Sequence, residues 1–379
     1  MQKELLRLSA ANEGDLCSGF RLVKKEYVPS KHADLYTMRH EKTKAELLYF
    51  ARADENKTFA IAFKTLPEDD TGVFHILEHS VLNGSRRFPV REPFVNLLQS
   101  SMQTFLNAMT YPDKTVYPVC SRNDKDFHNL MEVYLDAVFC PAIYEKPQIF
   151  MQEGWHYEFD SEDAEPYYNG VVYSEMKGAF SNVDELMETE SMRLLFPDNC
   201  YGFVSGGHPE SIPKLTYEQF IANHKRYYHP SNARIFLDGK MDIDEILRYI
   251  DGEYLSKYDY RAPDFDFTVQ KQVVGEKTVS YSVKPGEEAK AHMVFSKLLC
   301  AHDEPEKVLA ANVLAKYLTG SNEAPLKRTF LEQALCQDIS LQVNDGIFQP
   351  YITLTIRNTE QERFAQVEDC LRSSVQDIL

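Results

Sequence analysis

The sequence lacks three features that would point to particular classes of protein. Its seven cysteines are scattered and never form a Cys-x-x-Cys pair, so we predict reduced thiols and neither a disulfide framework nor cysteine-bound zinc. No stretch approaches the roughly 20 consecutive apolar residues of a membrane span. Lysine and arginine number 41 against 58 aspartates and glutamates, a formal net charge of −17. This balance argues against nucleic acid as a partner.

The first residues also lack the pattern of a sorting signal. Residues 1–8 contain no long apolar core, and they are not the acid-poor, Arg- and Ser-rich type of an organelle transit peptide. Together with the unpaired cysteines, this predicts a cytoplasmic protein of the bacterial type with no membrane partner. The length of 379 residues is enough for two domains.

A His-x-x-Glu-His sequence is the most informative local pattern. His75 and His79 stand four apart and Glu78 three after the first, so on an α-helix the three side chains share one face. Two imidazoles one turn apart can bind one tetrahedral Zn²⁺. The neighbouring carboxylate can take a proton from a water whose pKa the metal lowers to about 7. The order of the three residues is that of the inverted zincins, and the alternative is two surface histidines beside a solvated glutamate.

The surroundings of this motif favour a helix and leave the third ligand open. Apolar residues recur at helical spacing, Asp70 and Thr71 are N-cap candidates, and Asn83-Gly84 is a plausible stop. A catalytic zinc needs one more protein ligand, and spacing does not choose among several acids. The candidates are Glu153, Glu158, Glu175, Glu185 and Glu188.

The rest of the chain is typical of an α+β protein. Runs rich in aromatic and β-branched residues predict strands near 20–28, 33–38, 45–51 and 59–64, followed by a hairpin-like pair at 104–110 and 115–120. Pro118 favours a sheet edge there, where an extended peptide can add as a strand. A linker near 258–267 precedes a second unit, with strands expected near 277–283, 291–299, 339–343 and 351–357 and a helix over 359–379.

The motifs together resemble the pitrilysin/insulinase superfamily of zinc metallopeptidases, in particular its presequence protease branch, which includes falcilysin. The similarity is carried by His75-Ile-Leu-Glu-His79 and Tyr173-Ser-Glu-Met-Lys-Gly178. Further matching segments follow in the family's order. They are Asn107-Ala-Met-Thr-Tyr-Pro, Gln152-Glu-Gly-Trp-His-Tyr-Glu, Ser205-Gly-Gly-His-Pro, Ile212-Pro-Lys-Leu-Thr-Tyr and Tyr227-Tyr-His-Pro-Ser-Asn-Ala-Arg234.

This resemblance implies roles for individual residues. It makes Glu175 the third ligand of a single zinc per chain, with His75 and His79, and Glu78 the general base. Asn107 and Ala108 match the edge strand that pairs with the substrate backbone. The sequence departs from insulin-degrading relatives in carrying Tyr168 where they have an additional acid.

The resemblance also implies tandem α+β domains of the pitrilysin type, each a mixed sheet with packed helices. We expect a catalytic domain over 1–260, a linker at 261–271 and an incomplete second, non-catalytic domain over 272–379. The expected function is hydrolysis of short unstructured peptides inside a clamshell chamber completed by the missing C-terminal half, which in the family supplies an Arg and a Tyr to the substrate carbonyl. The alternative is a catalytically silent fragment or scaffold subunit. We also expect the last helix to carry an apolar face with no complete domain to receive it.

Overall fold

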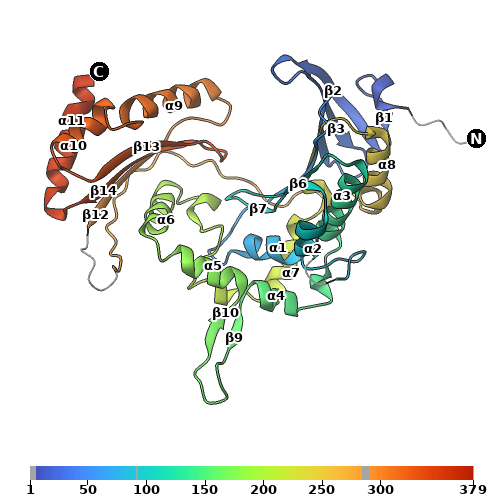
Figure 1. Cartoon of the computed structure of the whole chain (residues 1–379), viewed down its shortest axis with the longest axis horizontal. Helices are drawn as coiled ribbons and strands as arrows, with labels where there is room; N and C mark the ends of the chain where they lie inside the picture. The colour runs from blue at the N-terminus through green and yellow to red at the C-terminus, as the bar shows by residue number, and fades with distance from the viewer. Residues whose placement is uncertain (1–5, 91–92, 284–289, 379) are drawn as a thin grey trace, which may run out of the picture. The chain divides into compact units, whose positions relative to one another are not determined.

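The computed structural model describes residues 6–90, 93–283 and 290–378, and these form two compact units. The first unit comprises Met1–Ala179 and Val204–Asp266, and the second Phe180–Phe203 and Phe267–Leu379. Residues 180–203 thus group with the second unit, although they fall within the range 1–260 that we assigned to the first domain. Figure 1 shows the course of the chain.

The first unit is built on a nine-stranded mixed sheet in the order β1-β2-β3-β4-β11-β5-β8-β6, with β7 also paired to β8. Strand β11 runs parallel to β4 and antiparallel to β5, whereas the other pairs are antiparallel. The strands are β1 (Leu16–Cys17), β2 (Phe20–Val28), β3 (Ala33–His40), β4 (Glu46–Ala51), β5 (Lys57–Lys64), β6 (Gln103–Leu106), β7 (Met109–Thr110), β8 (Lys114–Ser121) and β11 (Ala233–Asp238). The four strands predicted between residues 20 and 64 are confirmed.

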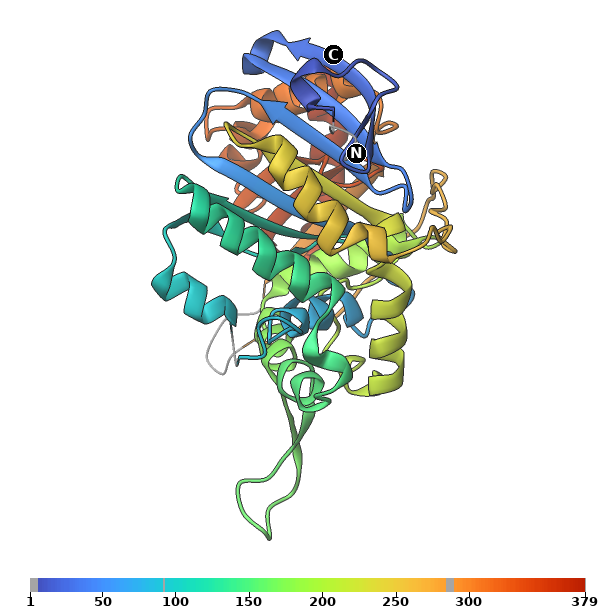
Figure 2. The ribbon, with the colours of Figure 1, turned by 90° about the vertical axis from the view of Figure 1, so that its right-hand side faces the viewer.

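Helices α3 and α8 lie across one face of this sheet, as Figure 2 shows. Helix α3 buries the stripe Phe127, Leu130, Met131, Tyr134, Leu135 and Val138, and Asn123 caps its N-terminus by accepting from the Asp126 amide. The helices of the first unit are α1 (Val73–Val81), α2 (Pro93–Ser100), α3 (Asp124–Phe139), α4 (Gln148–Glu153), α5 (Val171–Ala179), α7 (Tyr217–Tyr227) and α8 (Ile243–Glu253). A two-stranded hairpin joins α4 to α5 and consists of β9 (His156–Glu158) and β10 (Tyr167–Asn169).

The prediction that Pro118 marks a sheet edge is wrong. Strand β8 is internal, because it pairs with β5 on one side and with β6 and β7 on the other. The proline is tolerated because the neighbouring ladder is interrupted there: β6 ends at Leu106 and β7 begins at Met109. Between them, the Asn107 amide donates to the Pro118 carbonyl at 3.2 Å. The interrupted edge is therefore β6–β7.

The second unit has a three-stranded antiparallel sheet in the order β12-β14-β13. Its elements are α6 (Val183–Leu195), β12 (Ala291–Leu298), α9 (Pro305–Thr319), α10 (Pro325–Glu332), β13 (Asp338–Asn344), β14 (Tyr351–Thr359) and α11 (Phe364–Ile378). Residues 277–283 form no strand, contrary to prediction. They have β-branched residues but no ladder partner in the described part of the chain.

The last helix carries the predicted apolar face, and the second unit already provides a core that receives much of it. On α11, Val367 and Cys370 are buried and Leu371 packs beside them, in a cluster with Phe330 of α10 and Ile356 of β14. Val375 stays exposed, and Leu379 lies outside the described residues. Across the described residues, none of the helices combines the length and the apolar character that crossing a membrane requires.

Candidate metal centre

Helix α1 holds the two motif histidines on its less buried side. Val73, Phe74, Ile76, Leu77 and Val81 are buried, which confirms the predicted helix and leaves His75 and His79 partly accessible.

The entry to α1 differs from the prediction. Its N-cap is Gly72, which has a φ of +67°, and a Cβ there would lie 2.6 Å from the Gly206 carbonyl oxygen. Neither predicted cap is used: the Asp70 side chain accepts from the Val204 amide, and the Thr71 hydroxyl donates to Asp69. A long-range contact with the loop at 204–207 therefore sets the start of this helix.

Each histidine is oriented by a hydrogen bond at Nδ1. His75 Nδ1 lies 2.9 Å from the Gly206 carbonyl oxygen, and His79 Nδ1 lies 3.3 Å from Glu153 Oε2 on α4. Since both acceptors lack a hydrogen, the two Nδ1 atoms carry the protons, and the Nε2 lone pairs are left to act as ligands. This pairing of each imidazole with a carbonyl or carboxylate is the usual support of a metal-binding histidine.

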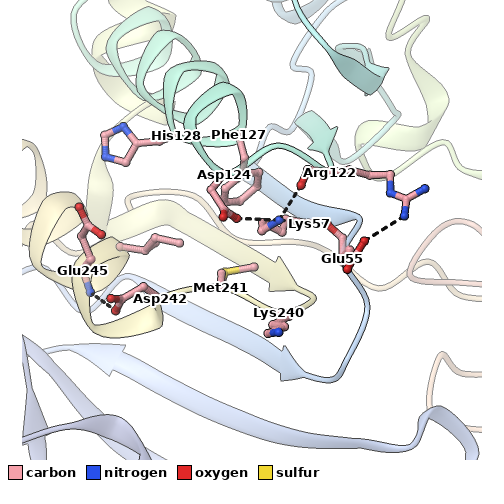
Figure 3. Close-up of a pocket in the computed structure, with 11 residues that line it drawn as sticks. Glu55, Lys57, Arg122, Asp124, Phe127, His128, Lys240, Met241, Asp242 and Glu245 are labelled. Atoms are coloured by element: carbon pink, nitrogen blue, oxygen red, sulfur yellow. Dashed lines mark hydrogen bonds and ion pairs between the residues drawn. The ribbon is translucent and has the colours of Figure 1, made fainter.

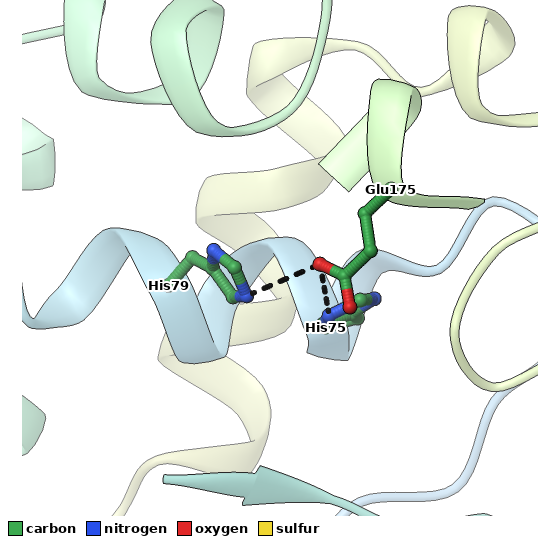
Figure 4. Close-up of side chains that lie close together, drawn as sticks. All are labelled: His75, His79 and Glu175. Carbon is green, nitrogen blue, oxygen red and sulfur yellow. Dashed lines mark ion pairs between the residues drawn. The ribbon is translucent and has the colours of Figure 1, made fainter. Parts of the chain in front are cut away.

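Glu175 on α5 completes a group of three potential ligands, drawn in Figure 4. Its Oε2 lies 3.7 Å from His75 Nε2 and 3.9 Å from His79 Nε2, and one ligand atom from each of the three lies within 4.8 Å of the others. Atoms bound tetrahedrally to Zn²⁺ at 2.0–2.1 Å are separated by about 3.3 Å. The two distances to Glu175 exceed this spacing by about 0.4 and 0.6 Å. Two imidazole nitrogens and one carboxylate are also the donor types of a catalytic zinc, so the residues fit this metal.

The electrostatics around His79 balance two effects. Burial lowers the pKa of the imidazole, but the hydrogen bond to Glu153 and the nearby Glu78 and Glu175 carboxylates outweigh it, so that its pKa is raised. The negative charges of Glu78, Glu153 and Glu175, which stabilise a proton on His79, would also stabilise a bound cation.

Glu78 stands on the same helix, α1, and is only 8% exposed. Its Oε2 accepts a hydrogen bond from Thr110 Oγ1 of β7 at 2.7 Å. The pKa of the Tyr134 hydroxyl is raised, first by the burial of this tyrosine and second by the nearby charge of Glu78. Glu78 is thus held at a fixed position beside the edge strand β7.

Asn107 and Ala108 lie in the interruption between β6 and β7. The Asn107 carbonyl oxygen accepts from the Tyr134 hydroxyl at 3.1 Å, and the Asn107 side chain accepts from the Ala108 amide at 3.0 Å. The side chain of Asn107 is exposed. The Ala108 amide therefore already has a hydrogen-bond acceptor, and that acceptor belongs to an exposed side chain.

Three contributions to this site were not assigned from the sequence. Glu153 was considered only as a ligand and instead holds His79. The Gly206 carbonyl holds His75, although the sequence singled out this glycine only as part of a segment that matches the family. Thr110 holds Glu78. All three depend on contacts distant in sequence, so no local pattern identifies them. Tyr168, which stands in place of an acid, packs against Trp155 and Tyr157 in the hairpin.

A separate cavity of about 630 Å³ is lined by Glu55, Lys57, Arg122 and Asp124, and shares no residue with the histidine group. Figure 3 shows the Lys57 ammonium inside it. The ammonium has three acceptors, the carbonyl oxygens of Glu55 and Arg122 and a carboxylate oxygen of Asp124, at 3.1, 2.9 and 2.8 Å. Its donors are already used, so it offers a ligand little beyond a charge.

Two domain families match the chain. Residues 66–182 match "Insulinase (Peptidase family M16)" and residues 214–379 match "Peptidase M16 inactive domain". The mixed sheet, the helix bearing two histidines and these matches define the class: the chain belongs to peptidase family M16. The matched ranges cover one domain of each type, the second described as inactive.

Individual relatives refine this placement. The chain is 44% identical to Protein HypA of Clostridium perfringens over 97% of its own length and 38% of that protein. It is 38% identical to Presequence protease 1, chloroplastic/mitochondrial, of Arabidopsis thaliana over 95% of its length and 34% of that protein. The chain is thus a homologue of presequence proteases and spans little more than a third of the curated relatives it matches. Its own compartment stays a prediction.

A solved structure supports the fold. The crystal structure of pitrilysin superimposes with a TM-score of 0.63 over 94% of this chain and 37% of the other. At 14% identity this similarity concerns the fold alone. It agrees with the α+β, tandem-domain class that the sequence predicts.

Proposed function

We propose that this chain carries the zinc-dependent catalytic centre of an endopeptidase that hydrolyses short unstructured peptides. Membership of family M16 supports a peptidase, and M16 peptidases are generally zinc-dependent. The observation that carries the proposal is the convergence of two Nε2 atoms, each imidazole held at Nδ1, on the Glu175 carboxylate.

His75, His79 and Glu175 would hold one zinc ion per chain. When bound, zinc supplies Lewis-acid chemistry, which polarises a substrate carbonyl and makes water more acidic. Glu78 is the general base: it removes a proton from the attacking water and can later deliver it to the leaving amine. The hydrogen bond from Thr110 keeps the Glu78 carboxylate from rotating away.

The edge at Asn107 and Ala108 receives the peptide backbone. Strand addition uses main-chain groups, so selectivity for side chains is expected to be broad. A peptide paired there passes beside Glu78, because β7 follows directly and its Thr110 contacts that carboxylate. The Asn107 side chain must release the Ala108 amide for pairing, an exchange of one hydrogen bond for another.

The proposal extends to a longer protein of the size of the relatives. A chamber built with the portion that the longer relatives have, and that this sequence does not include, would exclude folded proteins by size. A second candidate is a catalytically silent chain, favoured by the match of residues 214–379 to a family described as an inactive domain. Both candidates keep the zinc centre and differ in turnover.

The test separates metal binding from chemistry. Metal-free protein reloaded with zinc is expected to bind one ion per chain, and Glu175→Ala to lose it. Glu78→Gln is expected to retain zinc while hydrolysis of an unstructured peptide falls about 10²–10⁴-fold, because the amide keeps the shape but not the base. Full zinc retention by Glu175→Ala would refute the ligand assignment. Turnover of Glu78→Gln within a few-fold of the parent would refute the base.

A further inference from the structure

The β9–β10 hairpin extends away from helices α4 and α5 in both views (Figures 1 and 2). Its two faces differ in character. On one face, Glu158 Oε2 accepts from Asn169 Nδ2 at 3.0 Å and lies 3.3 Å from His156 Nε2, so the polar groups there satisfy each other. A two-stranded hairpin is only marginally stable by itself. The side chains on its other face therefore either stabilise the hairpin or bind a partner.

The other face is aromatic and accessible. Tyr157 and Tyr168 are directly opposite in the register, with ring centroids 5.1 Å apart. Trp155 packs edge-on against both. Tyr157 is 56% exposed, Phe159 55% and Tyr168 39%. We call Trp155, Tyr157, Phe159 and Tyr168 the aromatic strip. The rings of Trp155, Tyr157 and Tyr168 are in contact, and the exposed Phe159 follows Tyr157 by two residues. Exposed apolar patches mark interaction surfaces.

The strip begins beside the metal centre. Trp155 stands two residues after Glu153, which holds His79, and its indole nitrogen is fixed on the Leu215 carbonyl at 2.9 Å. At the other end of the hairpin, the Asn169 side chain accepts from Ser174 Oγ, one residue before Glu175. A Cβ at Gly170 would lie 2.3 Å from the Gly154 carbonyl oxygen, so the base of the hairpin is closed tightly.

The charge of the hairpin is of one sign. From residue 156 to residue 169 the sequence has five acids and neither lysine nor arginine. Four of the acids follow the strip in the connecting loop, at positions 160, 162, 163 and 165. Aromatic faces attract guanidinium and ammonium groups. The negative charges of the loop acids attract the same cations. The surface is complementary to cationic side chains.

We propose that the aromatic strip and the adjoining acidic loop capture Lys/Arg-rich segments of peptides. The hairpin leads directly into the helix that carries Glu175, so a peptide held on the strip is presented near the metal centre. This inference rests on the proposed function only for the fate of the captured peptide. Capture itself requires neither zinc nor hydrolysis.

The test measures peptide binding in the 379-residue chain carrying Glu78→Gln, so that bound peptide is not cut. The probes are an unstructured fluorescent peptide with several arginines and its citrulline counterpart, which lacks the charge. We expect the arginine peptide to bind about tenfold more tightly, and Tyr157→Ser/Phe159→Ser to remove most of that difference. Tyr157→Phe/Tyr168→Phe is the matched control, which keeps the rings and should keep the preference. Neutralising the four loop acids should weaken only the arginine peptide and reduce the salt dependence of its binding.

Equal affinity for the two peptides, or an undiminished preference in the Tyr157→Ser/Phe159→Ser variant, would overturn the proposal. So would a concentration-dependent dimer that this variant abolishes, because the strip would then be an interface with a second copy. Zinc content and hydrolysis are measured separately on the parent chain. A loss of preference without any zinc-dependent hydrolysis would leave capture standing and favour the catalytically silent chain over the peptidase, whereas the reverse result would refute capture alone.

Discussion

The imidazoles of His75 and His79 are held by acceptors of different charge. His75 donates to a neutral carbonyl, and His79 to the Glu153 carboxylate, which is 6% exposed. A buried carboxylate behind a histidine makes the ligand more basic and fixes its ring, and loss of such a partner typically weakens metal binding about 10–100-fold. The contribution of Glu153 can therefore be measured independently of the ligands.

Glu153→Gln is expected to weaken zinc binding about tenfold while retaining the stoichiometry of one. The amide can still accept from His79 Nδ1 but no longer supplies charge. Competition with a chelator of known affinity measures the change, with Glu218→Gln on the exposed side of α7 as control. An unchanged zinc affinity in Glu153→Gln would show that the charge of the carboxylate 3.3 Å from His79 Nδ1 has no role in metal binding.

His224 on α7 makes stability depend on pH. Burial lowers its pKa from 6.5 to about 4, and its ring lies between the Tyr144 hydroxyl and the Val138 carbonyl. Between pH 6.5 and 4 the unfolded chain binds a proton here that the folded chain does not. The free energy of unfolding therefore falls on acidification, by roughly 3 kcal/mol over this window, and is fully retained above pH 6.5.

His224→Gln should remove this term. The variant is expected to be less stable at pH 7.5, but to lose less free energy than the parent between pH 6.5 and 4.5. Urea unfolding at several pH values measures both slopes. His229, whose pKa burial also lowers to about 4, contributes equally to both proteins, so only the difference is used. Parallel pH profiles would contradict the assignment to His224.

At the scale of elements, the sequence predicted those features that depend on residues close together in the chain. The helix at 73–81 follows from its apolar stripe, and its His-x-x-Glu-His face from helical geometry. The cap at Gly72, the internal position of β8 around Pro118 and the missing strand at 277–283 depend on partners distant in sequence. Glu175, 175 − 79 = 96 residues beyond His79, was singled out through resemblance alone, and the structure brings it to the histidines.

The edge strand offers a test at this scale. Replacing Ala108 by proline removes the amide that now donates to Asn107 Oδ1 and that a paired peptide would use. We expect Ala108→Pro to weaken binding of an unstructured peptide about tenfold, as for loss of one or two hydrogen bonds, with zinc binding unchanged. Ala108→Val, which keeps the amide, is the control. Equal peptide affinity in the two variants would argue against strand addition at this edge.

At the scale of the whole molecule, the second unit presents an unusual helix. Leu309, Val313 and Tyr317 of α9 are 66%, 63% and 58% exposed and, spaced four apart, lie on one face. A helix in a globular protein normally buries its apolar face. The relatives are much longer than this chain, which spans 34% of the Arabidopsis protease, and the family resemblance places groups that contact the substrate carbonyl in the portion this sequence does not include.

We therefore predict that the 379-residue chain binds zinc fully but hydrolyses peptides slowly. Losing one group that stabilises the transition-state oxyanion costs about 10²–10³-fold in rate, whereas the ligands His75, His79 and Glu175 all belong to one unit of this chain. The measurement is the hydrolysis rate per bound zinc on one unstructured peptide, for three proteins. These are this chain, the whole Arabidopsis presequence protease 1, and a fragment of that protease matched to the region of similarity. The two short proteins should be alike and at least about 100-fold slower than the whole protease. A rate per zinc for this chain equal to that of the whole protease would mean that these 379 residues complete the catalytic machinery by themselves, and the two-part chamber would have to be abandoned for this protein.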